Sequence, residues 1–177
     1  MKKFSYAYPR PMVTVDIVLF ALKRSIPSIL LVKRLKDPYA GLWALPGGFV
    51  EMEEDLITAA YRELLEETGL EADSLYQLCT VGTPGRDPRG RTISVVYSGF
   101  YNKECQPVGG SDAKDACWQS IAELPLLAFD HNRITATVMK RWKSVAGYAS
   151  CSVRIHPAIL SAFEKYIIQV DSYEHII

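Results

Sequence analysis

The chain has 177 residues, with 20 Lys and Arg balanced by 20 Asp and Glu. This length suits one domain with a real hydrophobic core and leaves room for a short appendage. Hydrophobic residues make up 49% and charged residues 23% of the chain, which is typical of a globular protein and argues against disorder. A formal net charge of zero gives no global attraction to nucleic acid or to an anionic membrane, so local groups must hold any anionic ligand.

The sequence also argues against a membrane-spanning or secreted protein. The longest apolar stretch, residues 13–22, contains Asp16 and is about ten residues long, too short to cross a bilayer. The positively charged start is followed by polar residues and prolines rather than by the apolar segment of a signal peptide. The 4 cysteines lack the spacing of zinc ligands, so reduced thiols in a cytoplasmic protein are expected.

The N-terminal half predicts strands followed by one helix. Apolar, β-branched runs bounded by turns favour strands, and glycines punctuate an extended segment that follows a loop. These segments are 13–20, 29–34 and 43–50. A helix is expected to begin near Asp55, a good N-cap residue, and to end at Gly69, where a C′ glycine fits.

The C-terminal half mixes further strands and helices. Strand-like segments are expected at 75–81, 92–101 and 116–118. One helix is expected from Asp130 to Gly147, and another from Pro157, which is favourable in a first helical turn, to Val170. This irregular order of elements favours an α+β fold or α/β/α layers over a doubly wound sheet.

The most informative region is an acidic helix end at residues 62–69. Glu63 is three residues from Glu66 and four from Glu67, so three carboxylates crowd one side of the helix. Each like-charged pair costs about 0.2–0.5 kcal/mol, and the helix dipole disfavours each anion at this end by about 0.3–1 kcal/mol. Arg62 offsets only part of this repulsion, through its spacing to Glu66. A hard divalent cation such as Mg²⁺ would supply the missing positive charge, whereas the alternative is a solvated acidic surface.

The neighbours of these glutamates complete a long motif. Gly47 and Gly48 lie on the extended segment upstream, where backbone groups can approach a ligand closely, and Glu54 adds a fourth carboxylate at the start of the helix. From Gly48 onward the sequence follows G-x5-E-x7-R-E-L-x-E-E-x-G-L. This pattern matches every specified position of the Nudix box, G-x5-E-x7-R-E-U-x-E-E-x-G-U, where U is aliphatic. The chain therefore resembles the Nudix hydrolases.

This resemblance implies a fold and a reaction. Nudix proteins have an α/β/α sandwich built on a mixed β-sheet, so we expect a Nudix hydrolase domain at 1–147 and a short C-terminal helical extension at 148–177. Most members hydrolyse a diphosphate linked to a further moiety with the help of a divalent metal, here expected to be Mg²⁺ or Mn²⁺. The metal neutralises the diphosphate and lowers the pKa of a bound water, which attacks phosphorus while a carboxylate acts as general base.

The resemblance also assigns roles to individual residues. The expected metal ligands are the carbonyl of Gly48 and the side chains of Glu63, Glu66 and Glu67. Arg62 is expected to orient these glutamates by ion pairing, and it forms the catalytic set together with them, while Glu54 has an outer role at the metal. The candidates for the general base are Glu67, Asp112, Asp115 and Glu123.

A cationic loop after the box indicates the substrate class. It contains Arg86, Arg89 and Arg91 among prolines and glycines, which suits binding of a phosphate or a terminal ribose phosphate; the alternative is a solvent-exposed turn. Pro84 lies about fifteen residues beyond the box, which resembles the ADP-ribose pyrophosphatase subgroup. The three arginines and Gly47 are the residues expected to bind substrate.

The wider sequence is similar to ADP-ribose pyrophosphatases and to the Nudix domain of the related repressors of NAD metabolism. The similar segments are 8–11, 13–16, 84–91 and 127–131. The implied reaction converts ADP-ribose and water to AMP and ribose 5-phosphate. The aromatic candidates for stacking on adenine are Tyr8, Trp43 and Tyr97.

Two other interpretations stay open. The repressors sense ADP-ribose and carry a winged helix, but only about 30 residues follow Gly147 here and they are not notably basic, so nucleic acid is not an expected partner. An intact box also favours an enzyme over a sensor that has lost catalysis. A nucleoside triphosphate pyrophosphatase would share every box residue and would differ in the arginine loop. Because family members commonly dimerise, a homodimer is expected.

Overall fold

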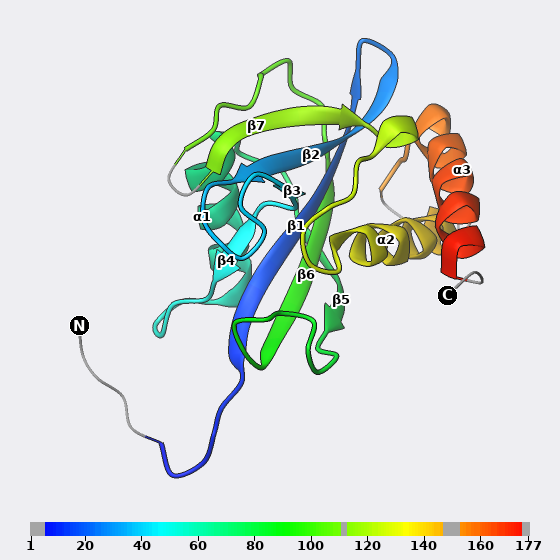
Figure 1. Cartoon of the computed structure of the whole chain (residues 1–177). Helices are drawn as coiled ribbons and strands as arrows, with labels where there is room; N and C mark the ends of the chain where they lie inside the picture. The colour runs from blue at the N-terminus through cyan, green and yellow to red at the C-terminus, as the bar shows by residue number, and fades with distance from the viewer. Residues whose placement is uncertain (1–5, 111–112, 147–152, 175–177) are drawn as a thin grey trace.

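A mixed β-sheet with helices on both faces forms the architecture of the chain (Figure 1). The computed structural model describes residues 6–110, 113–146 and 153–174. Helix α1 (Leu56–Thr68) packs against one face of the sheet, whereas α2 (His131–Ala146) and α3 (Pro157–Glu174) pack against the other. This arrangement confirms the predicted α/β/α sandwich.

The sheet is mixed because one central pair of strands is parallel. The described strands are β1 (Met12–Lys23), β2 (Ile26–Arg34), β3 (Trp43–Ala44), β4 (Gly47–Phe49), β5 (Tyr76–Val81), β6 (Thr92–Tyr101) and β7 (Ala113–Ser120). Their order is β3-β2-β1-β6-β5, with β4 paired to β1 and β7 paired to β2. β1 and β6 run parallel, and the other pairs of described strands run antiparallel.

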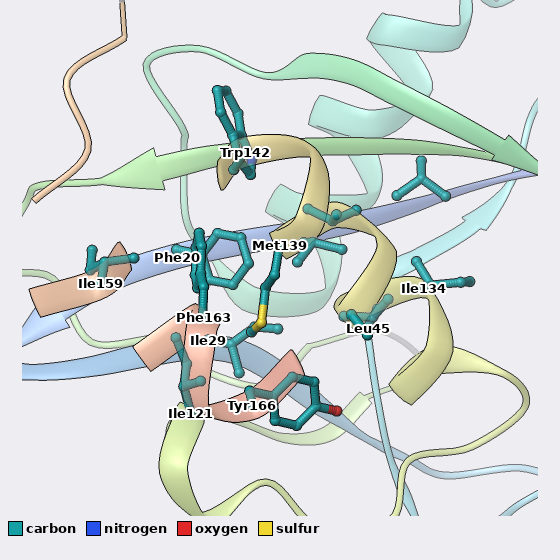
Figure 2. Packing of buried hydrophobic residues seen from close by; sticks show 14 of the residues in the cluster. Phe20, Ile29, Leu45, Ile121, Ile134, Met139, Trp142, Ile159, Phe163 and Tyr166 are labelled. Carbon is teal, nitrogen blue, oxygen red and sulfur yellow. The ribbon is translucent and has the colours of Figure 1, made fainter. Parts of the chain in front are cut away.

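Strand β1 contributes to a core on each face of the sheet. Successive side chains of a strand point to opposite faces, so Phe20 packs with α2 and α3 while Leu19 packs with Leu64 of α1. Figure 2 shows the first of these cores, in which the ring centroids of Phe20 and Phe163 lie 4.6 Å apart. Burial on both faces explains why β1 is a nearly continuous apolar run.

The ends of α1 lie where the sequence predicts them. Asp55 is the N-cap, and its carbonyl accepts the Ala59 N–H at 2.9 Å, although its side chain makes no capping hydrogen bond. Gly69 has a φ of 67°, a left-handed conformation that glycine adopts readily, and its N–H donates to the Leu65 carbonyl at 2.8 Å. The box glutamates at 63, 66 and 67 therefore lie in the last turns of the helix.

Several strand predictions differ from the structure: β1 runs to Lys23 rather than to residue 20, and β2 begins at Ile26 rather than at residue 29. The extended segment at 43–50 divides into β3 and β4 around Pro46, which has no N–H to donate to a ladder. Strand β7 is longer than the predicted 116–118, because it pairs with β2 from Ala113 to Ser120. Pairing between strands this far apart in sequence leaves little trace in a local pattern.

Helix α3 packs into the same core as α2. Ile159, Phe163 and Tyr166 belong to this core, and the Tyr166 hydroxyl accepts a hydrogen bond from Asn132 Nδ2 at 3.2 Å. The predicted helix end at Gly147 and the domain boundary beside it lie outside the described residues, so the division of the chain there stays a prediction. No helix in the described part of the chain is long and apolar enough to cross a membrane.

Candidate active site

A cavity of about 570 Å³ lies where β4 and the acidic end of α1 meet the 82–91 loop and the start of α2. Of the described residues that line it, seven are acidic and six are basic. A balance this even gives little attraction for a diphosphate, which is strongly anionic. A cation bound on the acidic side would change that balance.

Strand β4 needs glycine at two positions because its backbone passes very close to neighbouring groups. A Cβ atom on Gly48 would clash with the Glu63 carboxylate, and one on Gly47 would clash with the Val15 carbonyl. The Gly47 N–H donates to Glu67 Oε2 at 2.9 Å. The glycines expected to approach a ligand therefore lie directly against the box glutamates, and Gly47, which is expected to bind substrate, already donates its N–H to Glu67.

Arg62 orients three glutamates. Its Nε and Nη2 donate to the two oxygens of Glu54 at 2.7 and 2.8 Å, and its Nη1 donates to Glu63 Oε1 at 2.7 Å. Nη1 also lies 3.3 Å from Glu66 Oε2. The ion-pairing role expected for Arg62 fits these contacts, but its bidentate partner is Glu54, eight residues away, which the i,i+4 pattern does not indicate. Hydrogen bonding between them lowers the pKa of Glu54 and raises the pKa of Arg62.

Burial disfavours the charged form of two of the box carboxylates. It raises the pKa of Glu67 to about 8, and the nearby charges of Glu63 and Asp16 add to this rise. Burial also raises the pKa of Glu63, although Arg62 opposes the shift. A bound cation would stabilise the charged form of both carboxylates.

The donor set fits a hard divalent cation, although it is not arranged as a finished metal site. The residues expected to hold the metal all line the cavity and offer oxygen ligands, and they are Gly48, Glu63, Glu66 and Glu67. Within the described residues, no three His, Cys, Asp or Glu side chains are grouped as a metal site. Arg62 holds two of the glutamates and the Gly47 N–H holds the third, so a cation would compete with these contacts.

Two of the three predicted loop arginines reach the cavity, and each is already paired with an aspartate. The Arg86 side chain is only 5% exposed, and its Nε and Nη2 donate to the two oxygens of Asp130 at 2.9 and 2.7 Å. Arg89 donates from Nε and Nη2 to Asp87, with 2.7 Å between Nη2 and Oδ2. These pairs fix the direction in which each guanidinium plane points.

In each of these guanidinium groups, the aspartate pair uses Nε and Nη2 and leaves Nη1 over. Neither Arg86 Nη1 nor Arg89 Nη1 has a hydrogen-bond partner among the residues that the structure describes. An oriented N–H donor with no protein partner is suited to bind a phosphate oxygen. An anion could therefore bind there without breaking either aspartate pair.

Other predicted residues lie away from the cavity. Arg91 does not line it, and its Nη1 donates to the Thr92 carbonyl at 3.4 Å. Among the candidates for general base, Asp115 and Glu123 are exposed and do not line the cavity, and Asp112 lies outside the described residues. Glu67 is thus the described candidate that faces the cavity.

The aromatic residues at the cavity are not the ones that the sequence suggested. Tyr8 is 81% exposed on the N-terminal arm, Tyr97 is 4% exposed in the core, and Trp43 is half-buried in β3; none of the three lines the cavity. Phe49 and Phe129 line it instead. Neither follows a periodic pattern that would have separated it from ordinary apolar residues.

A buried polar group on β1 was also missed. Asp16 accepts a hydrogen bond from Ser94 Oγ and lies 3.7 Å from Arg86 Nη2. His131 places its Nε2 3.6 Å from Asp16 Oδ1, and its Nδ1 accepts the Leu45 N–H at 2.9 Å. Burial lowers the pKa of His131 and so favours the neutral form of the ring, against the opposing charges of Asp16 and Asp130. A charged residue inside the apolar run of β1 was the available signal, since buried charges require partners.

Residues 10–141 match the family model of the NUDIX domain. The chain belongs to the Nudix family. This Nudix chain is 41% identical over 145 residues to the ADP-ribose pyrophosphatase of Methanocaldococcus jannaschii, a match covering 81% of each protein. It is 33% identical over 161 residues to the ADPR responsive transcriptional repressor NtrR of Acinetobacter baylyi, covering 89% of the Nudix chain and 64% of the repressor.

A solved structure supports the same relationship. The NUDIX domain of Shewanella oneidensis NrtR, complexed with ADP ribose, matches with a TM-score of 0.71 and 34% identity, over 77% of this chain and 91% of that one. The chain thus covers 91% of that Shewanella domain, but less than two thirds, 64%, of the Acinetobacter repressor. These findings confirm the resemblance and the fold class, and they support the prediction of a Nudix pyrophosphohydrolase.

Proposed function

We propose that this Nudix protein is a metal-dependent pyrophosphohydrolase that converts ADP-ribose and water to AMP and ribose 5-phosphate. The observation that carries the proposal is one cavity with two chemically different sides. Carboxylates of α1, two of them half-buried, face it from one side, and the oriented guanidinium groups of Arg86 and Arg89 face it from another. A diphosphate offers oxygens to both.

On the acidic side, the proposed residues hold Mg²⁺ or Mn²⁺. The ligands are the Gly48 carbonyl and the side chains of Glu63, Glu66 and Glu67. Bound there, the metal supplies charge neutralisation and a water of lowered pKa. Glu54 keeps Arg62 in place, and Arg62 in turn orients the ligand glutamates.

On the basic side, Nη1 of Arg86 and of Arg89 donates to phosphate oxygens of the substrate. The aspartate pairs keep these donors aimed at the cavity, so little reorganisation is needed on binding. Glu67 is the proposed general base, because it is the described candidate that lines the cavity. In that role one of its carboxylate oxygens accepts the proton of the attacking water.

Product analysis tests this function. The protein is incubated with ADP-ribose, NADH, dinucleoside polyphosphates and nucleoside triphosphates, in Mg²⁺ or Mn²⁺ and in EDTA. Metal-dependent release of AMP and ribose 5-phosphate from ADP-ribose alone is the expected result. Cleavage of another diphosphate would keep the enzyme and reject the substrate, and preference for nucleoside triphosphates would favour a nucleoside triphosphate pyrophosphatase.

A second candidate function is an ADP-ribose sensor. It is favoured by the similarity to the repressor and to its domain complexed with ADP ribose. A sensor would bind ADP-ribose and melt at a higher temperature with it, yet release no product in either metal.

We also propose that the protein is a homodimer and that it is cytoplasmic. Light scattering of the purified chain tests the first of these proposals.

A further inference from the structure

Phe129 has a backbone conformation that bulky residues rarely adopt. Its φ is 54°, in the left-handed region, where the side chain is crowded. Conformations of this kind persist only where surrounding contacts hold them, and they gather at functional sites. Phe129 lines the cavity and directly precedes Asp130 and His131, which hold Arg86 and the Leu45 N–H. The strained residue therefore lines the cavity itself and directly precedes two residues that contact the 82–91 loop and the segment before β4.

The Phe129 ring packs against two guanidinium groups. Arg34 Cζ lies 4.9 Å and Arg89 Cζ 5.3 Å from the ring centroid, within the range of cation–π contacts. Tyr39 meets the same ring edge-on, with 4.8 Å between centroids. These partners come from the end of β2, the loop after it and the 82–91 loop. The ring thus contacts two regions that are far in sequence from residue 129 and from each other, residues 34–39 and the 82–91 loop.

The same contacts set the position of Arg89 in the cavity. Its guanidinium lies 5.1 Å from the ring of Phe49, the residue that follows Gly48 on β4. Asp87 holds Nε and Nη2 of this group, so the contacts with two rings and one carboxylate leave Nη1 as the edge without a partner among the described residues. Arg34 also lines the cavity, and its Nε donates to the Pro38 carbonyl at 2.8 Å.

We propose that Phe129 is a positioning residue that holds Arg34 and Arg89 where they bind a phosphate of a nucleoside diphosphate derivative. The inference rests on the proposed function for the identity of this ligand. Phe129 does not touch the reacting atoms. It acts through the two arginines, so its loss should weaken substrate binding and leave the chemistry at the α1 glutamates largely intact.

Three variants separate the ring from the backbone. Phe129→Tyr keeps the ring, Phe129→Leu keeps the bulk and the strain without the ring, and Phe129→Gly removes both. Each is assayed for KM and kcat with ADP-ribose and Mg²⁺, and for the Kd of ADP-ribose in EDTA, where the metal contributes nothing. Tyr76→Leu is the matched control, because it removes a ring that is 41% exposed on β5 and contacts Trp142 rather than the cavity.

The expected result is a rise of about fivefold in KM and Kd for the Leu and Gly variants, with kcat changed by less than about twofold. The Tyr variant should recover most of the affinity, and Tyr76→Leu should leave both constants unchanged. Wild-type values in Phe129→Leu would overturn the inference. So would a loss of kcat alone, a Gly variant that binds normally, or a wild-type protein that binds no ADP-ribose in EDTA. If the wild type binds with this dependence on Phe129 but yields no product with metal, the proposed function fails and the positioning role stands.

Discussion

The acidic end of α1 and the 82–91 loop differ in how their charged side chains are paired. On α1, the single guanidinium of Arg62 serves three carboxylates, while Glu67 depends on the Gly47 N–H. In the loop, Arg86 and Arg89 each have an aspartate of their own. The helix end therefore has too few cationic groups for its carboxylates, whereas each of the two loop guanidinium groups is neutralised and oriented by an aspartate.

This difference separates two ways of binding an anion. A site short of positive charge recruits a cation and then uses it to neutralise the substrate. A site whose arginines are already paired with carboxylates adds little net positive charge. Its contribution is to orient the substrate, through N–H groups that are held in place before the substrate binds. The predictions below test this division, beginning with the largest effect.

The largest effect is expected at the metal side. Glu67→Gln, and likewise Glu63→Gln, should lower kcat at least about a hundredfold, because each removes the charge of a proposed metal ligand. Turnover with saturating Mg²⁺ measures this loss, and a native circular-dichroism spectrum excludes unfolding. Glu71→Gln, which changes an exposed glutamate beyond the helix, is the matched control. Near-normal rates in the first two variants with a native spectrum would reject the metal assignment.

A smaller loss is expected when the orienting arginine is changed. Arg62→Lys keeps the charge but cannot reproduce the bidentate contact with Glu54, so kcat should fall about tenfold and more Mg²⁺ should be needed for half-maximal activity. Titration of activity with Mg²⁺ gives both numbers. An unchanged Mg²⁺ requirement would mean that Arg62 does not act on the ligand glutamates.

The loop arginines should affect affinity more than turnover. Arg86→Ala or Arg89→Ala is expected to raise KM for ADP-ribose about tenfold, because each removes a charged hydrogen-bond donor. Cleavage of simpler diphosphates should suffer less. Arg91→Ala serves as the comparison, since Arg91 does not line the cavity. Equal losses on every substrate would make the loop purely structural.

The last prediction concerns the stability of the metal-free protein against pH rather than its activity. Burial raises the pKa of Glu67 from 4.5 to about 8, so the folded state binds more protons than the unfolded state between these values. The free energy of unfolding should therefore fall as the pH rises through this window. Urea denaturation in EDTA at several pH values measures the slope. The slope should be shallower in Glu67→Gln and with added Mg²⁺, and an equal slope in that variant would show that another group is responsible.

Prediction from the sequence was strongest where the signal is local. The spacing of Glu63, Glu66 and Glu67 places them on one side of a helix whatever surrounds it, and Asp55 and Gly69 mark its ends. The apolar run of β1 likewise predicts a strand buried on both faces. Such features depend on the periodicity of the backbone, which a short stretch of sequence records.

Prediction was weakest where partners are distant in the chain. Asp130 pairs with Arg86 across 44 residues, and Asp16 lies beside both Arg86 and His131 only because β1, the loop and α2 converge. The sequence suggested three arginines for the substrate, but it carries no local sign that Arg91 lies outside the cavity. Likewise, nothing local in the sequence indicates that the rings of Phe49 and Phe129 line the cavity.

The sequence by itself determined the crowding of carboxylates on one side of the acidic helix, the family to which the chain belongs and the layered fold that follows from it. The tertiary structure decided which charges are buried, which arginines face the cavity and which aromatic rings hold them. The reason is physical: helical spacing is a property of the local backbone, whereas burial and pairing depend on which distant segments the packed core brings together.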